Sequence, residues 1–129
     1  MANLTLNEYQ DKAMSTCLPE SDNIFYMLAN LVGEVGEFAS KAGKHMRKGK
    51  LHITTIPRNE QGQVLHTQVW NVTEEERKLM LSEIGDILWQ TAGLANVMGV
   101  TLEDVAQENL AKLASRQRRN VIDGDGDER

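Results

Sequence analysis

The sequence carries two short acidic motifs, Gly33-Glu34-Val35-Gly36-Glu37 and Glu83-Ile84-Gly85-Asp86. Each motif places two carboxylates three residues apart, and in an α-helix this spacing puts both on one face, about one turn apart. Four carboxylates that face one another repel. A hard divalent cation relieves that repulsion, because Mg²⁺ prefers oxygen ligands and is commonly held by carboxylates together with substrate phosphates. The two motifs therefore predict two helices that meet at a metal site.

Apolar segments border both motifs. No charged residue occurs in 23–33 or in 87–102. Such segments predict helices that are buried on most sides, with the carboxylates at the edge of apolar surface. At helical spacing the apolar side chains form one stripe on each helix, and these stripes are expected in the core: Leu28, Leu31, Val32, Val35, Phe38, Ala39 and Ala42, then Met80, Ile84, Ile87, Leu88, Thr91 and Ala95. The alternative is that the acidic residues are ordinary surface charges, the commoner use of Glu and Asp.

Length and composition favour one helical domain. The chain has 129 residues, 40% of them apolar, with two prolines and a net charge of −5. The negative charge argues against a nucleic-acid polymer as partner. Cys17 is the single cysteine. It cannot form an intrachain disulfide and, without a long apolar run, the sequence predicts a cytoplasmic protein with no membrane contact. We expect one helical domain over 1–119 and a flexible tail over 120–129.

Three capping boxes mark helix starts: Thr5 with Glu8, Thr73 with Glu76, and Thr101 with Asp104. In a capping box the threonine and the acidic residue each accept a hydrogen bond from the other's backbone amide. The predicted helices cover about 6–18, 23–48, 74–98 and 102–115, and Asp22 is expected to cap the second. The predicted fold class is all-α, a four-to-five-helix bundle.

The helical period disappears between 51 and 71. Two segments rich in β-branched residues, 51–56 and 64–70, flank the turn-prone stretch 57–62. This pattern predicts a β-hairpin inserted at about 51–71, or a flap if the strands do not pair. Because an isolated hairpin is only marginally stable, it must lean on the helices or on a partner subunit.

Basic residues follow the first motif on its helix. Lys41, Lys44 and Lys48 fall on the same helical face as Glu34 and Glu37. They are placed to meet the negative tail of a ligand whose metal sits on the carboxylates, and Lys41 is our main candidate. The alternative is that Lys41 pairs with Glu37 at i,i+4 while the others complement the helix dipole.

A polar row lies on the last predicted helix. Asn109, Lys112 and Arg116 recur there at i, i+3 and i+7. A guanidinium matches the geometry of a phosphate, so Arg116 is a candidate for substrate binding, although it also suits plain solubility.

Taken together, the sequence resembles the MazG-like nucleoside triphosphate pyrophosphohydrolases of the all-α NTP pyrophosphatase superfamily. The resemblance covers 31–39 with its Glu-x-x-Glu, 81–99 with its Glu-x-x-Asp, and 102–119 with Asn109 and Lys112. It implies hydrolysis of a nucleoside triphosphate, often a deoxy or noncanonical one, to the monophosphate and pyrophosphate, as in cleansing of the nucleotide pool. It also implies a homodimer or homotetramer with sites between helices of neighbouring subunits.

The resemblance assigns roles to particular residues. Asn109 and Lys112 are implied to contact substrate phosphate or sugar. Mg²⁺, with Mn²⁺ as the expected substitute, is implied to bind four carboxylates: Glu34, Glu37, Glu83 and Asp86. Because attack of water on the α-phosphorus needs a proton acceptor, a carboxylate that is not fully committed to metal can serve as the base, and Glu34 and Glu37 are the candidates.

The chain departs from the family pattern at two places. The family often has a second acidic residue just before its Glu-x-x-Glu, where this chain has Gly33, and the insertion at 51–71 is unusually long. Two alternatives stay open at this point. One is phosphoribosyl-ATP pyrophosphohydrolase, which has similar helices and acidic motifs, and the other is a non-catalytic helical dimerisation module.

Overall fold

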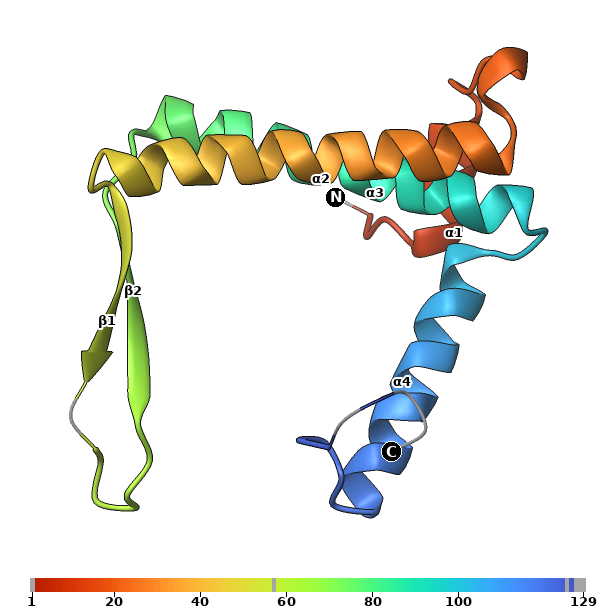
Figure 1. Cartoon of the computed structure of the whole chain (residues 1–129). Coiled ribbons are helices and arrows are strands. Elements are labelled where there is room, and N and C mark those ends of the chain that lie inside the picture. Colours follow the sequence, from red (N-terminus) through yellow and green to blue (C-terminus); the bar gives the residue numbers. More distant parts are fainter. Residues whose placement is uncertain (1, 57, 125, 127–129) are drawn as a thin grey trace. The chain divides into compact units, whose positions relative to one another are not determined.

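The computed structural model describes residues 2–56, 58–124 and 126 (Figure 1). Within this part the chain has four α-helices, one 3-10 turn and one two-stranded sheet, in this order: α1 (Leu6–Met14), η1 (Pro19–Ser21), α2 (Ile24–Arg47), β1 (Leu51–Ile56), β2 (Leu65–Trp70), α3 (Glu74–Val97) and α4 (Leu102–Arg118). The predicted all-α class with an inserted hairpin is confirmed. Two compact units make up the chain: Met1–Leu28 with Trp89–Arg129, and Ala29–Leu88.

The predicted domain limits stay predictions. The helical domain was placed over 1–119 and the tail over 120–129. Residues 125 and 127–129 of that tail lie outside the described residues. Within the described part of the chain, no helix has the length and apolar character that crossing a membrane requires.

Capping boxes start three of the helices, as predicted. At α1 the Thr5 hydroxyl accepts from the Glu8 amide at 3.1 Å, and the Glu8 carboxylate accepts from the Thr5 amide at 2.8 Å. The same reciprocal bonds join Thr73 with Glu76 before α3, and Thr101 with Asp104 before α4. The short polar side chains satisfy amides that the first helical turn leaves unpaired.

Three predictions about helix ends were wrong. α1 ends at Met14 rather than near residue 18, because a tight turn follows in which the amides of Thr16 and Cys17 bond the carbonyls three residues earlier, both at 3.0 Å. At the start of α2, Asn23 rather than Asp22 accepts from a backbone amide, that of Tyr26, at 2.9 Å.

α4 is longer than predicted and runs to Arg118.

Gln10 organises the unit formed by Met1–Leu28 and Trp89–Arg129. Its side chain donates to the carbonyls of Ala92 and Val100 and accepts from the Leu102 amide at 2.8 Å. Although Gln10 is buried, both ends of its amide are therefore satisfied. The residues around it form a small apolar core: Ala92, Ala95 and Leu102, with Tyr9 and Met14 against them.

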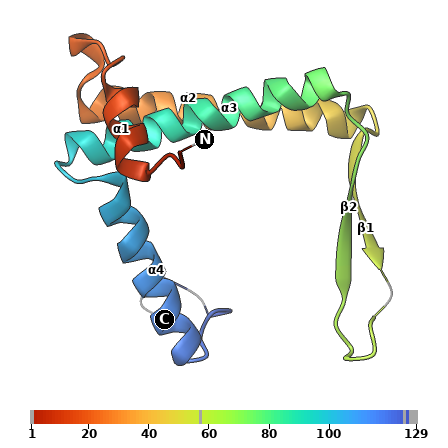
Figure 2. The ribbon, with the colours of Figure 1, turned by 180° about the vertical axis from the view of Figure 1, so that it is seen from behind.

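The predicted hairpin forms, with β1 and β2 antiparallel and Leu51 opposite Trp70. In both views it projects from the ends of α2 and α3 that it connects (Figures 1 and 2). A backbone bond of 2.7 Å from the Asn71 amide to the Lys50 carbonyl closes its base. Pro57, which was predicted in the turn, lies outside the described residues.

The predicted core stripes are only partly buried. Met80 is buried as expected, with 3% of its surface exposed. In contrast, Val32 is 66% exposed, Val35 47%, Ile84 48% and Leu88 41%. The expectation that these four lie in the core of the chain was wrong, because helical periodicity identifies an apolar face and does not say which surface covers it.

Candidate metal centre

The candidate centre lies entirely within the unit Ala29–Leu88. In this unit α2 and α3 run antiparallel, as the side-chain contacts of Lys41 with Glu83 and of His45 with Glu76 require (Figure 2). Helical spacing then presents both acidic motifs to each other, since each motif occupies one face of its helix.

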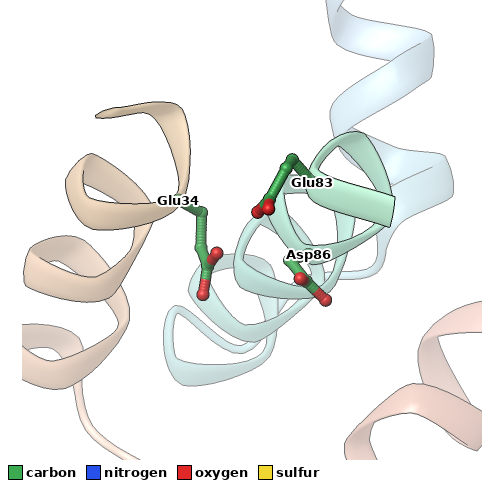
Figure 3. A group of neighbouring side chains, drawn as sticks. All are labelled: Glu34, Glu83 and Asp86. Atoms are coloured by element: carbon green, nitrogen blue, oxygen red, sulfur yellow. The ribbon is translucent and has the colours of Figure 1, made fainter. Parts of the chain in front are cut away.

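Three of the four predicted carboxylates come together. Glu34 of α2 faces Glu83 and Asp86 of α3 (Figure 3), and one ligand oxygen from each lies within 4.8 Å of the others. Glu83 is buried, Glu34 is half-buried and Asp86 is exposed. Within the described part of the chain, these three residues form the one group of Glu, Asp, His or Cys side chains whose ligand atoms lie close enough together to hold a metal ion.

Glu37, the fourth predicted carboxylate, does not belong to this group of three. It is exposed on α2, one turn after Glu34. It is still close enough to Glu83 to contribute to the lowered pKa of that carboxyl, after the larger effect of Lys41. Glu37 therefore lies at the border of the cluster.

Lys41 bridges the two helices through the cluster. Its ammonium donates to Glu83 Oε1. The ion pair of Lys41 therefore reaches across to Glu83 on α3. The predicted alternative, an ion pair with Glu37 along α2, is not the one observed. The hydrogen bond to Glu83 raises the pKa of Lys41, and in return it lowers the pKa of Glu83. Both groups are thereby held in their charged forms.

Glu34 has the opposite shift. Burial raises the pKa of its carboxyl, and the neighbouring charges of Glu37, Asp86 and Glu83 raise it further. Like charges at short range make each carboxylate harder to ionise, so the cluster stores repulsion that a bound cation would relieve.

The residues present fit a divalent cation. Glu83 Oε1 is bonded by Lys41, but its other oxygen, Oε2, is buried without a hydrogen-bond partner. A buried carboxylate oxygen without a partner is costly. A hard cation that takes oxygen ligands would satisfy it and would bring Glu34 and Asp86 into the same ligand shell.

A second charged network fixes the hairpin next to this cluster. Lys50 Nζ donates to both oxygens of Glu76 at 2.8 Å, and His45 Nδ1 lies 3.5 Å from Glu76 Oε2. Together with the Thr73 cap, Lys50 lowers the pKa of Glu76 to about 2. His45 packs edge-on near Trp70 with ring centroids 6.5 Å apart. Sequence spacing gave no signal for this network, because its members are far apart along the chain.

The predicted substrate residues of α4 belong to the other unit. Asn109 and Lys112 are exposed and line a cavity of about 490 Å³ together with Val100 and Val105. Arg116 is buried, with 6% of its surface exposed. Their contact with substrate stays a prediction.

Comparison with known proteins identifies the family. The family model described as "MazG nucleotide pyrophosphohydrolase domain" matches residues 24–121, which include both acidic motifs. The chain belongs to the MazG family. This membership confirms the resemblance noted in the sequence, and it supports nucleotide pyrophosphohydrolase activity in general terms.

A relative from a phage is similar over most of the chain. The "Gene 37 protein" of Mycobacterium phage L5 is 38% identical over 108 residues, which cover 84% of this chain and 78% of the phage protein. Its name states no activity. No solved structure matches the chain significantly. The MazG assignment therefore rests on the family model, and the site on the geometry described above.

Proposed function

We propose that this MazG-family protein hydrolyses a nucleoside or deoxynucleoside triphosphate to the monophosphate and pyrophosphate in a Mg²⁺-dependent reaction. The observation that carries the proposal is the convergence of Glu34, Glu83 and Asp86 on one point, with a buried oxygen of Glu83 lacking a partner. Nucleotide-pool cleansing in the cytoplasm is the role that this reaction suggests.

Glu34, Glu37, Glu83 and Asp86 are the proposed metal ligands. When bound, Mg²⁺ would neutralise charge on the phosphoryl oxygens and lower the pKa of a bound water, with Mn²⁺ as its substitute. Lys41 keeps Glu83 ionised and oriented toward α2, because its ammonium donates to Glu83 Oε1.

Glu34 and Glu37 are the proposed proton acceptors. The reaction needs a carboxylate that takes a proton from the attacking water while the α-phosphorus gains a bond to the water oxygen. Glu37 is the better placed of the two, because it borders the cluster and is exposed, whereas Glu34 belongs to the group of three. Asn109 and Lys112, from the resemblance, and Arg116, from the geometry of its guanidinium, are the proposed contacts to phosphate or sugar.

A homodimer or homotetramer is the proposed state in solution. Four apolar side chains of the unit Ala29–Leu88 are between 41% and 66% exposed: Val32, Val35, Ile84 and Leu88. Water contact of so many aliphatic side chains on two adjacent helices is unfavourable, and a second copy would remove it.

Pyrophosphate release from a substrate panel tests the proposed function. The panel contains the four canonical dNTPs, several modified dNTPs, ribonucleoside triphosphates and phosphoribosyl-ATP, each with and without Mg²⁺. We expect release from at least one nucleoside triphosphate only when Mg²⁺ is present. Turnover of phosphoribosyl-ATP alone would assign the protein to the related pyrophosphohydrolase instead. No turnover and no Mg²⁺-dependent rise in Tm with nucleotide would favour a non-catalytic module.

A further inference from the structure

A second pocket lies beside the carboxylate cluster in the unit Ala29–Leu88. Its volume is about 180 Å³, and its walls come from the end of α2 and the start of α3: Lys41, Lys44, His45, Lys48, Glu76 and Leu79. Neither the family membership nor the proposed metal site gives this pocket a role. Three lysines in one small cavity indicate an anionic ligand.

The charges of the pocket do not cancel within the chain. Among the described residues, neither Lys44 nor Lys48 forms an ion pair. Glu76 is the acidic residue in the lining, but Lys50 donates to both of its oxygens. Two ammonium groups therefore remain without a carboxylate, and the pocket carries an excess of positive charge.

His45 adds a buried polar group to this lining. Its side chain is 9% exposed, and Nδ1 is buried without a hydrogen bond, although Glu76 Oε2 lies 3.5 Å away. A buried ring nitrogen without a hydrogen bond is costly. Because Nδ1 is closed off from the pocket and faces Glu76, contact with an anion falls to the lysines rather than to this nitrogen.

Lys41 connects the pocket with the carboxylate cluster. It lines the pocket and donates to Glu83 Oε1. On α3, Leu79 of the pocket and Glu83 of the cluster are four residues apart, about 6 Å along a helix axis. The pocket and the carboxylate cluster are therefore neighbours on α3.

Resting on the proposed function, we propose that this pocket binds the β- and γ-phosphates of the triphosphate and then the pyrophosphate product. The reaction breaks the bond between the α-phosphorus and the oxygen that bridges to the β-phosphorus. That oxygen keeps the electron pair and leaves as part of pyrophosphate, while the water oxygen joins the α-phosphorus and its proton goes to a carboxylate. Lys44 and Lys48 stabilise the charge that develops on this leaving group.

Binding of inorganic pyrophosphate tests the proposal directly. Isothermal titration of the full chain in Mg²⁺ compares the natural protein with a Lys44→Gln/Lys48→Gln double variant. Lys78→Gln is the matched control, since Lys78 is an exposed lysine of α3 outside the pocket lining. We expect the double variant to lose about tenfold in pyrophosphate affinity and to gain a similar factor in KM for the triphosphate. The control should match the natural protein.

Two further probes separate this pocket from a nonspecific anion site. The double variant should bind Mg²⁺ alone and a deoxynucleoside monophosphate as the natural protein does, with an unchanged Tm. Unaltered pyrophosphate affinity in the double variant would overturn the proposal, and so would an equal loss for the monophosphate. Equal affinity of the natural protein for phosphate and pyrophosphate would also contradict it. Because these are binding measurements, failure of the proposed catalytic function would appear separately, as absent pyrophosphate release by the natural protein.

Discussion

Lys41 on α2 donates to Glu83 on α3, and this contact joins the helix of the Glu-x-x-Glu motif to that of the Glu-x-x-Asp motif. The lysine thereby places a positive charge within the cluster of Glu34, Glu83 and Asp86, which Glu37 borders. It lowers the local repulsion of the metal-free protein, and it also competes with a cation for Glu83.

Lys41→Met should separate metal binding from substrate binding. Without the ammonium, Mg²⁺ affinity in the absence of nucleotide should rise about fivefold, as expected for a partly exposed charge contact. KM for the triphosphate should rise at the same time, because Lys41 also lines the lysine pocket. Titration calorimetry with Mg²⁺ and steady-state kinetics give the two values. Lys78→Met is the control, and weaker Mg²⁺ binding by Lys41→Met would contradict this account of Lys41.

Glu34→Gln should stabilise the metal-free protein. The pKa of Glu34 is raised in the fold, so ionisation of this residue is harder in the folded state and stability falls as pH increases past the ordinary range of a glutamate. A neutral glutamine removes that cost. We expect a higher Tm than in the natural protein at pH 7 in EDTA, a smaller rise in Tm on adding Mg²⁺, and loss of turnover. A Tm equal to or below that of the natural protein in EDTA would show that repulsion in the cluster is negligible.

Glu76 should contribute to acid stability. Its pKa is lowered from 4.5 to about 2 by Lys50 and the Thr73 cap. A carboxylate with a depressed folded pKa adds stability that is fully present above its unfolded pKa and is lost as pH falls through the folded value. Between pH 4.5 and about 2, Tm should therefore fall more steeply for the natural protein than for Glu76→Gln. Parallel curves of Tm against pH would contradict the assigned network.

Gly93→Ala should destabilise the unit formed by Met1–Leu28 and Trp89–Arg129. A Cβ at Gly93 would overlap Met27 Sδ, and Met27 is fully buried. Moving the methionine should cost about 1–3 kcal/mol, measured by urea unfolding. Gly43→Ala is the matched control, because a Cβ there meets no atom within 4 Å and should stabilise α2 by up to about 1 kcal/mol. Equal stability of the two variants would show that Met27 moves without cost.

The sequence predicted local features of the fold most reliably. The three capping boxes, the hairpin and the pairing of the two acidic motifs each depend on residues with a fixed chemical preference, such as the threonine at a helix start. The convergence of Glu34, Glu83 and Asp86 followed from spacing alone once the two helices ran side by side.

Other features needed the three-dimensional arrangement. Lys41 could pair along its own helix or across to α3, and only the fold selects Glu83. The pairing of Lys50 with Glu76 depends on where the hairpin leaves the helices. The two apolar stripes, with Val32 on α2 and Ile84 on α3, were placed in the core because periodicity cannot distinguish a face covered by the same chain from one left for a partner.

Hydrolysis in H₂¹⁸O tests the central claim most directly. The natural protein with Mg²⁺ and a deoxynucleoside triphosphate that it accepts should place the label in the deoxynucleoside monophosphate and leave pyrophosphate unlabelled. Asp86→Asn should abolish the reaction while the circular dichroism of its helices stays unchanged. Label in pyrophosphate or phosphate, or full activity of Asp86→Asn, would contradict attack at the α-phosphorus by a centre built from these carboxylates.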